Sequence, residues 1–402
     1  MNTDRHQAHG ATTDSLAEWL RGHLPEIGGS ADAFADDRVA IEKTGVVRRP
    51  SAHLHSYRVA SEARSQAVLI KERPSAVVGR FPTPPGHWAL FVGPSWPPPP
   101  AFEHRSAVEF QALAKIHRHF SELNDPRFAT VRPIALQKLT SAFAMEEIDA
   151  VPLDRCLADE PARGNPPLAP PPLESCGAWL RHFHEMQAAA EAPVHHDTPG
   201  QILGALAELS AGLPVGFAPS EGIRELVSRT QRLIERALPE TLPIGLTHGD
   251  FWTGNVLVDA TGAVAVIDTF AASRTPIFED LAYFVFQLKT EGGALQKSSQ
   301  FRPSPRALER ELLFLRGYFP GSEIPIETLR VFELCVLIRK WASRCHRCAA
   351  YTGARRVWKR IQLSARSRHF RAYSEWLLGP LEAGPHRRAP SSPAAREVNH
   401  GA

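Results

Sequence analysis

The sequence contains no long apolar run, and none of its hydrophobic segments approaches the roughly 18 residues that a membrane-spanning helix requires. Its first ten residues, MNTDRHQAHG, are polar and lack the apolar core of a secretory signal. Cysteine is scarce, with five residues in 402, and this odd number favours reduced thiols over a disulfide framework. The formal net charge is only +3, which argues against nucleic-acid binding by bulk charge. These absences predict a cytoplasmic protein that has no transmembrane span and binds no nucleic acid.

Compact ligand-binding motifs are missing as well. The chain has no G-x-x-x-x-G-K-[ST] phosphate loop, which argues against the P-loop kinases, and it has no G-x-G-x-x-G. Cys345 and Cys348 have the spacing of half a zinc site, but no second Cys or His pair follows at a suitable distance. We therefore interpret them as two thiols on a helix.

Proline, in contrast, is abundant and clustered. The chain has 35 prolines, and two clusters of them lie in residues 74–101 and 161–172, where their density is incompatible with helices and central strands. The end of the chain, from Gly379, has the composition of a disordered tail. We predict four parts. Residues 1–34 form an N-terminal segment with a short helix, and residues 35–148 form an N-lobe that a Pro-rich insertion at 74–101 interrupts. Residues 149–378 form a C-lobe, and residues 379–402 form a tail.

The two lobes differ in hydrophobic periodicity. Short apolar runs bounded by turn residues predict strands in the first half, with one helix at residues 102–120. Apolar residues at helical spacing dominate the second half. Only residues 256–259 and 264–267 break that pattern, and Gly262 between them predicts a hairpin turn. The sequence therefore predicts an α+β protein with an antiparallel N-terminal sheet and a mainly helical C-lobe that contains one β-hairpin.

A polar loop precedes this hairpin. The stretch LTHGDFWTGNVLV places His248, Asp250 and Asn255 together, and Asp268 follows the second strand. Because a hairpin brings its two ends together, Asn255 and Asp268 should be neighbours. An amide oxygen and a carboxylate are suited to Mg²⁺ that also binds phosphate. Asp250 would then face the bound phosphate, which is the arrangement that phosphoryl transfer to a hydroxyl requires.

The string His248-Gly249-Asp250-x-x-x-x-Asn255, followed by Ile267-Asp268, resembles the aminoglycoside phosphotransferase family of small-molecule kinases. Asp280-Leu281-Ala282 and the helix that ends at His184 are similar to further motifs of that family. The resemblance implies a bilobal protein-kinase-like fold. It also implies that Asp250 is the catalytic base and that Asn255 and Asp268 bind Mg²⁺. His248, Asp280 and His184 are expected to support the loop structurally.

The resemblance assigns nucleotide binding to the N-lobe. Lys71, at the end of an apolar strand, is expected to contact the α- and β-phosphates, with Glu109 as its partner on the following helix and Glu103 as the second choice. The segment with Met145, Glu147 and Ile148 resembles the hinge strand between the lobes, and this strand is expected to contact the nucleotide base. The nucleotide is expected to be ATP, with GTP left open. Residues 44–51 replace the family's Gly-containing turn, and whether Arg48, Arg49 or Ser51 covers the phosphates stays open.

The acceptor is less well defined than the nucleotide. The segment from Arg339 to Arg371 contains eleven Lys or Arg and no Asp or Glu. Such a segment favours an anionic acceptor or contact with an anionic membrane surface, although a solvated face remains an alternative. The aromatics Trp88, Phe91 and Trp96 in the insertion are candidates for a lid or a contact patch, with packing filler as the alternative.

We therefore predict an ATP- and Mg²⁺-dependent phosphotransferase that moves the γ-phosphate to a hydroxyl of a small molecule, sugar-like or anionic, and that is not an antibiotic-resistance enzyme. Two alternatives stay open. One is a metal-dependent phosphohydrolase with His248, Asp250 and Asp268 as ligands. The other is a catalytically inactive kinase-like module that binds nucleotide. The sequence does not indicate an oligomeric state.

Overall fold

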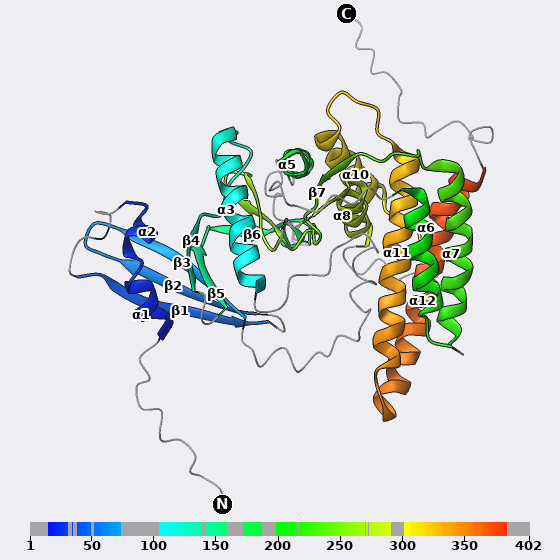
Figure 1. Cartoon of the computed structure of the whole chain (residues 1–402), viewed down its shortest axis with the longest axis horizontal. Helices are drawn as coiled ribbons and strands as arrows, with labels where there is room; N and C mark the ends of the chain where they lie inside the picture. The colour runs from blue at the N-terminus through cyan, green and yellow to red at the C-terminus, as the bar shows by residue number, and fades with distance from the viewer. Residues whose placement is uncertain are drawn as a thin grey trace, which may run out of the picture.

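The computed structural model divides the chain into a sheet-rich lobe and a helical lobe, as expected for the predicted two-lobed α+β fold (Figure 1). The expected fold class is thereby confirmed. The structure describes residues 15–30, 34, 38–49, 52–73, 104–137, 141–158, 172–186, 198–215, 217–269, 271, 273–290 and 301–383. The Pro-rich insertion with Trp88, Phe91 and Trp96, and also Ser51 and Glu103, lie outside these residues.

The N-lobe is built on a five-stranded antiparallel sheet with the order β1-β2-β3-β5-β4. One long helix, α3, lies against it (Figure 1). The bounds are β1 Ala40–Arg48, β2 His53–Ala60, β3 Ser65–Glu72, α3 Arg105–Leu123, β4 Pro133–Gln137 and β5 Ala142–Glu146.

Side chains alternate between the two faces of this sheet. Tyr57, Val59 and Ile70 are buried on the face covered by two short helices, α1 and α2. Phe143 and Met145 point to the opposite face, where they pack with α3 and the predicted hairpin. The single short helix expected within residues 1–34 is instead two helices, because the chain turns at Gly22 and His23. Their bounds are α1 Ser15–Arg21 and α2 Leu24–Gly28.

A small three-stranded sheet, order β6-β8-β9, connects the lobes and contains the predicted hairpin. Gly262 adopts a φ of +87° in its turn, a conformation that favours glycine. Asp259 Oδ1 accepts hydrogen bonds from the N–H groups of Thr261 and Ala263, so Asp259 is a turn residue. The strands of this sheet and of a neighbouring two-stranded sheet are β6 Ala150–Pro152, β8 Val256–Asp259, β9 Val264–Val266, β7 Ile244–Leu246 and β10 Arg274–Pro276.

The C-lobe is a helical assembly in which α6, α7, α11 and α12 lie side by side (Figure 1). Its helices are α4 Leu153–Ala158, α5 Leu173–Glu185, α6 Pro199–Ala211, α7 Ala218–Ala237, α8 Phe278–Thr290, α10 Pro305–Tyr318, α11 Ile326–Ala349 and α12 Gly353–Ala383. The expected start of a disordered tail at Gly379 was wrong. Helix α12 continues to Ala383 because Leu381 packs into the core and Arg229 of α7 pairs with Glu382. None of the described helices is long and apolar enough to span a bilayer.

Helices α5 and α10 cross with almost no side chain between them. A Cβ atom on Gly317 would lie 2.0 Å from the carbonyl oxygen of Glu174, and one on Gly177 would lie 2.0 Å from that of Phe314. Only glycine permits this approach of two backbones. The close crossing places His184, near the end of α5, beside Tyr318, at the end of α10. That contact is one support of the polar loop that precedes β8.

Candidate active site

The polar loop predicted from the sequence, His248 to Asn255, lies between β7 and β8 and is held by Asp280 at the start of α8. The carboxylate of Asp280 accepts hydrogen bonds from the backbone N–H groups of His248 at 2.7 Å and Gly249 at 2.9 Å. Gly249 has a φ of +85°, so a residue with a side chain would be strained there. A buried carboxylate at a helix start thus fixes the shape of the loop.

His184 completes this support. Its Nε2 lies 3.2 Å from Asp280 Oδ2, and its Nδ1 lies 2.7 Å from the hydroxyl of Tyr318. Burial by itself would raise the pKa of Asp280, but the hydrogen bond and charge of His184 hold it below its usual value. The geometry places His184 and Asp280 beneath the loop, as expected for supporting residues.

His248 is buried within an aromatic cluster that includes Trp179, Phe183 and Phe251. Burial lowers the pKa of its imidazole to about 4, so the ring is neutral at physiological pH. Its backbone, rather than its ring, makes the contact with Asp280. The packing agrees with a residue that shapes the loop.

Asp250, which is exposed, and Asn255, which is buried, lie close together in the loop. Asn255 Nδ2 donates to the backbone oxygen of Asp250 at 3.0 Å and to its Oδ2 at 3.2 Å. The backbone oxygen of Asn255 accepts a hydrogen bond from Ile267 at 3.1 Å, so the hairpin brings Asn255 next to the segment with Asp268. Asp250, Asn255 and the segment with Asp268 therefore lie close together, as the hairpin predicted.

Lys71 and Asp268 join the two lobes. Lys71 Nζ lies 2.5 Å from Glu109 Oε1 and 2.5 Å from Asp268 Oδ1, so the expected pairing of Lys71 with Glu109 is present. Burial alone would raise the pKa of Asp268, but the charge of Lys71 keeps it below its ordinary value. Asp268 also has a φ of +65°, an uncommon conformation for a non-glycine residue. Such strained positions occur often at functional sites.

The three predicted hinge residues differ in how they relate to this region. Met145 borders a pocket together with Glu109, Phe143 and Asp268. Ile148 packs partly buried behind it. Glu147 turns its side chain toward the sheet and accepts a hydrogen bond from Ser56 at 3.0 Å, and its backbone N–H donates to the carbonyl oxygen of Ala67 at 3.0 Å. The pocket thus lies between Met145 and Asp268, the partner of Lys71.

Sequence reasoning missed Tyr283 and Lys340 as neighbours of Asp250. Lys340 Nζ donates to the hydroxyl of Tyr283 at 2.7 Å and lies over its ring. Burial of the carboxylate raises the pKa of Asp250, although the residue keeps an exposed surface, while the charge of Lys340 and a hydrogen bond from Tyr283 oppose the rise. Tyr283 follows Asp280 by three residues, so it lies on the same side of α8 and was in principle detectable. Lys340 belongs to the basic segment, but its position beside Asp250 follows only from helix packing.

Two arginines also act on the site. Arg73 Nη2 lies 2.6 Å from Glu109 Oε2, so Glu109 lies between two cations. The charge of Arg49, in the turn that replaces the glycine-rich loop, contributes to the lowered pKa of Asp268. Arg49 was one of three residues left open for phosphate contact, and it is near enough to influence that carboxylate. The position of Arg73, two residues after Lys71, puts its side chain on the same face of the sheet.

A model of the phosphotransferase enzyme family, APH, matches residues 46–310, which is more than half of the chain. The chain belongs to this family. The match spans the predicted hinge, the Asp250 loop and the supporting Asp280 of this phosphotransferase, and it ends before Tyr318 and Lys340. Among curated proteins, none matches the chain significantly.

Solved structures extend the comparison to the fold of the phosphotransferase. Spectinomycin phosphotransferase APH(9)-Ia, in complex with ADP and spectinomycin, is 14% identical and superposes with a TM-score of 0.51, covering 90% of this chain and 98% of its own. At this identity the likeness shows a shared fold. Macrolide 2′-phosphotransferase MphH from Brachybacterium faecium is 16% identical, with a TM-score of 0.48, and the match covers 88% of this chain and 96% of its own. Choline kinase LicA from Streptococcus pneumoniae is 11% identical, with a TM-score of 0.46, and the match covers 88% of this chain and 99% of its own.

Proposed function

We propose that this phosphotransferase transfers the γ-phosphate of ATP, with Mg²⁺, to a hydroxyl group of an anionic small molecule. The observation that supports the proposal best is the grouping of Asp250 with two different sets of partners. One set is Asn255 and the Lys71–Asp268 pair. The other set is Tyr283 and Lys340. A carboxylate between a phosphate-binding group and an acceptor-binding group is placed for phosphoryl transfer.

The nucleotide side uses residues from both lobes. Lys71, oriented by Glu109, is the cation that can contact the α- and β-phosphates. In this proposal the nucleotide base lies against residues 145–148, and Met145, which lines the adjoining pocket, forms an apolar wall for it. The charge of Arg49 reaches Asp268, which makes Arg49 a candidate for a further phosphate contact. GTP stays an alternative, and ATP is proposed as the commoner donor of this reaction class.

The residues Asn255 and Asp268 fit a magnesium site. The side chain of Asp268 is 30% exposed and keeps a low pKa, so it is ionised at neutral pH. Asn255 uses its Nδ2 for Asp250, and its amide oxygen remains as the ligand atom. One carboxylate and one amide oxygen, completed by phosphate and water, form a donor set that Mg²⁺ prefers. When bound, the ion neutralises charge on the transferred phosphoryl group.

Asp250 supplies the base. In the proposed step its carboxylate accepts the proton of the acceptor hydroxyl while that oxygen bonds to the γ-phosphorus and the bond from this phosphorus to the β,γ-bridging oxygen breaks, releasing ADP. Asn255 restricts the rotation of the Asp250 side chain through its hydrogen bond to Oδ2. Asp280 and His184 contribute by holding the loop that presents Asp250.

Charge around Lys340 favours an anionic acceptor. Burial lowers the pKa of Lys340 to about 8, against the raising effect of Asp250, and the charges of Arg344 and Arg347 lower it further. A negatively charged group on the acceptor would relieve this repulsion between cations. A polycation such as an aminoglycoside would increase it. An antibiotic-resistance role is therefore disfavoured, and a sugar-like acid or a phosphorylated alcohol is the proposed acceptor class.

The two alternative functions fit the site less well. A phosphohydrolase would use His248 as a metal ligand, but this ring is buried among aromatic side chains. An inactive module would not need Asp250, Asn255, Lys71 and Asp268 to be grouped as they are. The deciding experiment is an acceptor screen with purified protein, Mg-ATP and pools of sugars, amino alcohols, sugar acids and sugar phosphates, read as ADP release. ADP release that requires an anionic alcohol supports the proposal, whereas release with water alone, or no binding of Mg-ATP, contradicts it.

A further inference from the structure

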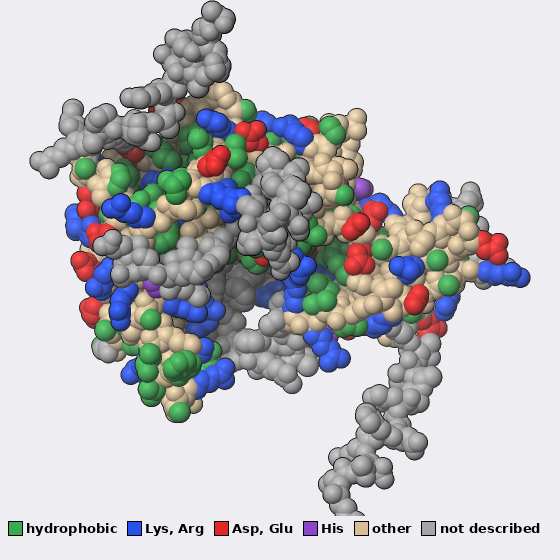
Figure 2. Space-filling model, turned by 180° about the vertical axis from the view of Figure 1, so that it is seen from behind, with side chains coloured by type: hydrophobic (Ala, Val, Ile, Leu, Met, Phe, Trp, Pro, Cys, Tyr) green, Lys and Arg blue, Asp and Glu red, His purple; other side chains and the backbone are tan. Residues whose placement is uncertain are grey.

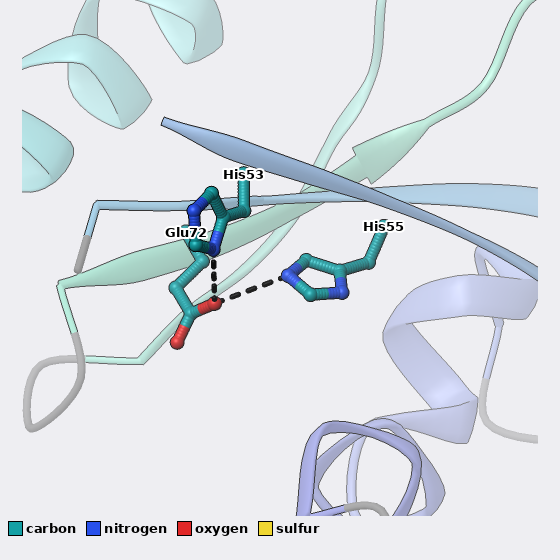
Figure 3. A group of neighbouring side chains, drawn as sticks. All are labelled: His53, His55 and Glu72. Atoms are coloured by element: carbon teal, nitrogen blue, oxygen red, sulfur yellow. Dashed lines mark hydrogen bonds and ion pairs between the residues drawn. The ribbon is translucent and has the colours of Figure 1, made fainter. Parts of the chain in front are cut away.

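Three potential metal-binding side chains meet on the N-lobe sheet, away from the candidate active site. His53 and His55 lie on β2 and Glu72 on β3, and the strands pair so that His53 is directly opposite Glu72. Residues two apart on a strand share a face, so His55 lies on the same side as His53. Figure 3 shows the two imidazoles directed at one carboxylate oxygen of Glu72.

The face of the sheet separates this group from the phosphate-binding residues. Glu72 directly follows Lys71, and successive side chains of a strand point in opposite directions. Lys71 points toward Glu109 and Asp268, whereas Glu72 points to the face that α1 and α2 cover. The two histidines and Glu72 continue the row of Tyr57 and Ile70 toward the open end of that face. They therefore serve no step of the proposed phosphoryl transfer.

We propose that His53, His55 and Glu72 form a binding site for a divalent transition metal, of which Zn²⁺ fits best. Glu72 Oε2 lies 3.0 Å from His55 Nε2 and 3.8 Å from His53 Nδ1, and all three ligand atoms lie within 4.8 Å of one another. Ligand atoms about 2.0–2.1 Å from a tetrahedral Zn²⁺ are separated by roughly 3.4 Å. Small rotations of the side chains are enough to reach that geometry.

The chemistry of the three groups agrees with this assignment. Two imidazole nitrogens and one carboxylate oxygen are a common donor set for zinc and leave one position for water or a fourth group. The side chains of His53 and Glu72 are 29% and 27% exposed, so an ion can enter from solvent. A bound ion would tie the end of β3, next to Lys71, to the start of β2.

Cobalt titration of the full-length protein tests the site. We expect one equivalent of Co²⁺ to give the intense visible bands of a four-coordinate complex, which added Zn²⁺ abolishes, and Zn²⁺ to raise Tm. His53→Ala should lose these bands and weaken Zn²⁺ binding by at least about 10-fold. Glu72→Gln, which keeps the size of the side chain, should do the same if folding of the first variant is impaired.

Two control variants distinguish this site from other binding. His104→Ala removes an exposed histidine that makes no side-chain cap contact, and Asp268→Asn alters the proposed magnesium site. Both should keep the four-coordinate cobalt spectrum. The proposal is overturned if the wild type binds no Co²⁺ in this form, or if His53→Ala and Glu72→Gln bind it as the wild type does. In that case Glu72 only pairs with His55 as a structural contact.

A second, independent feature lies at the free end of the α11–α12 pair. Val357, Trp358 and Ile361 are 60%, 58% and 58% exposed, and their spacing puts them on one side of the first turns of α12. Exposed arginines at positions 355, 356 and 360 surround them, and residues 339–371 contain no acid. In Figure 2, hydrophobic side chains gather beside Lys and Arg at this end of the molecule.

The geometry points to an anionic lipid surface as the partner of this patch. Apolar side chains ringed by cations on a helix match a bilayer that offers acyl chains beneath negative headgroups. Tryptophan in particular is stable at the boundary between the two. The patch lies on α12, beyond the end of α11, whereas Lys340 lies within α11 beside Asp250. The basic segment thus has one part at the candidate active site and one at the surface.

Vesicle sedimentation with the full-length protein tests this second proposal. We expect binding to vesicles that contain phosphatidylglycerol, little binding to pure phosphatidylcholine, and loss of binding in high salt. Trp358→Glu should reduce the bound fraction at least about 10-fold. Val215→Glu, which alters a side chain that is 93% exposed elsewhere, should leave it unchanged. Equal binding to neutral vesicles, equal loss in both variants, or a patch that instead mediates dimerisation or RNA binding would overturn the proposal.

Discussion

Lys71 Nζ lies 2.5 Å from Asp268 Oδ1, so the last residues of a strand in one lobe contact a hairpin end 197 positions later in the other lobe. Glu109 binds the same ammonium group at 2.5 Å. One cation thus connects a sheet, a helix and the hairpin of the candidate active site. Because Lys71 is the proposed phosphate contact as well, nucleotide binding should act on the relative position of the two lobes.

Replacing Lys71 tests its proposed role in phosphate binding. Lys71→Met should lower kcat/KM for ATP by roughly 10²-fold or more, since a phosphate-stabilising charge is removed from the site. Steady-state ADP release with an acceptor from the screen gives this value. Lys115→Met, an exposed lysine on α3, is the matched control and should behave as the wild type. Equal kinetics for the two variants would exclude a role of Lys71 in phosphate binding.

The base assignment is tested at Asp250. Asp250→Asn keeps the shape of the side chain but cannot accept the proton, so kcat should fall by about 10²–10⁴-fold. Mg-ATP should still raise Tm, because Lys71, Asn255 and Asp268 are intact. Turnover and nucleotide-induced stabilisation are measured on the same preparation. Retention of wild-type turnover in this variant would show that Asp250 is not the base.

The pH dependence should report Lys340. Its pKa is lowered to about 8, so it is charged below that pH and neutral above it. If it binds an anionic acceptor, KM for the acceptor should rise as pH increases through about 8. Lys340→Arg stays charged over the whole range, and its KM should stay flat there. As pH falls, Asp250 becomes protonated and activity is lost. This loss should begin at a pH above the ordinary carboxyl pKa, because the pKa of Asp250 is raised. If KM for the acceptor changes in the same way above about pH 8 in the wild type and in Lys340→Arg, Lys340 does not bind the acceptor.

The glycine crossing of α5 and α10 should affect activity from a distance. Gly317→Ala places a Cβ 2.0 Å from the backbone of Glu174 and must push the helices apart. We expect a loss of stability of about 1–3 kcal/mol and a lower kcat, since His184 and Tyr318 support Asp280 through this contact. Gly204→Ala, on α6 with open space around its Cα, should be neutral or stabilising. Chemical denaturation and turnover assays measure both effects, and similar values for the two variants would contradict this coupling.

A buried ionic cluster in the C-lobe predicts a large stability effect without a direct effect on chemistry. Glu333 lies 2.9 Å from Lys289 and 2.7 Å from Arg330, and both carboxylate oxygens are used. Glu333→Gln leaves buried positive charge undercompensated and should cost about 3–5 kcal/mol of unfolding free energy. Glu375→Gln, which alters an exposed pair with Arg229, should cost at most about 1 kcal/mol. Denaturant titration compares the two, and equal midpoints would show that the cluster adds nothing.

Much of the candidate site could be predicted from the sequence because its parts are local. A loop of eight residues and a hairpin of two short strands are defined by spacing and turn residues, so the amino-acid pattern was enough to group Asp250, Asn255 and Asp268. The Lys71–Glu109 pairing could also be predicted, since the strand end and the following helix face recur in the family that the motifs resemble. The prediction that a disordered tail begins at Gly379 was wrong, because Leu381 packs into the core and helix α12 continues past Gly379.

The sequence by itself determined the class of chemistry, namely carboxylates and an amide on one loop and hairpin. Only the tertiary structure decided what surrounds them. Lys340 reaches Tyr283 beside Asp250 because α11 packs on α8, and the glycine crossing brings His184 to Tyr318. Strand register placed Glu72 opposite His53. Turns are governed by neighbouring residues, whereas helix packing and strand register depend on how the whole chain buries its apolar surface.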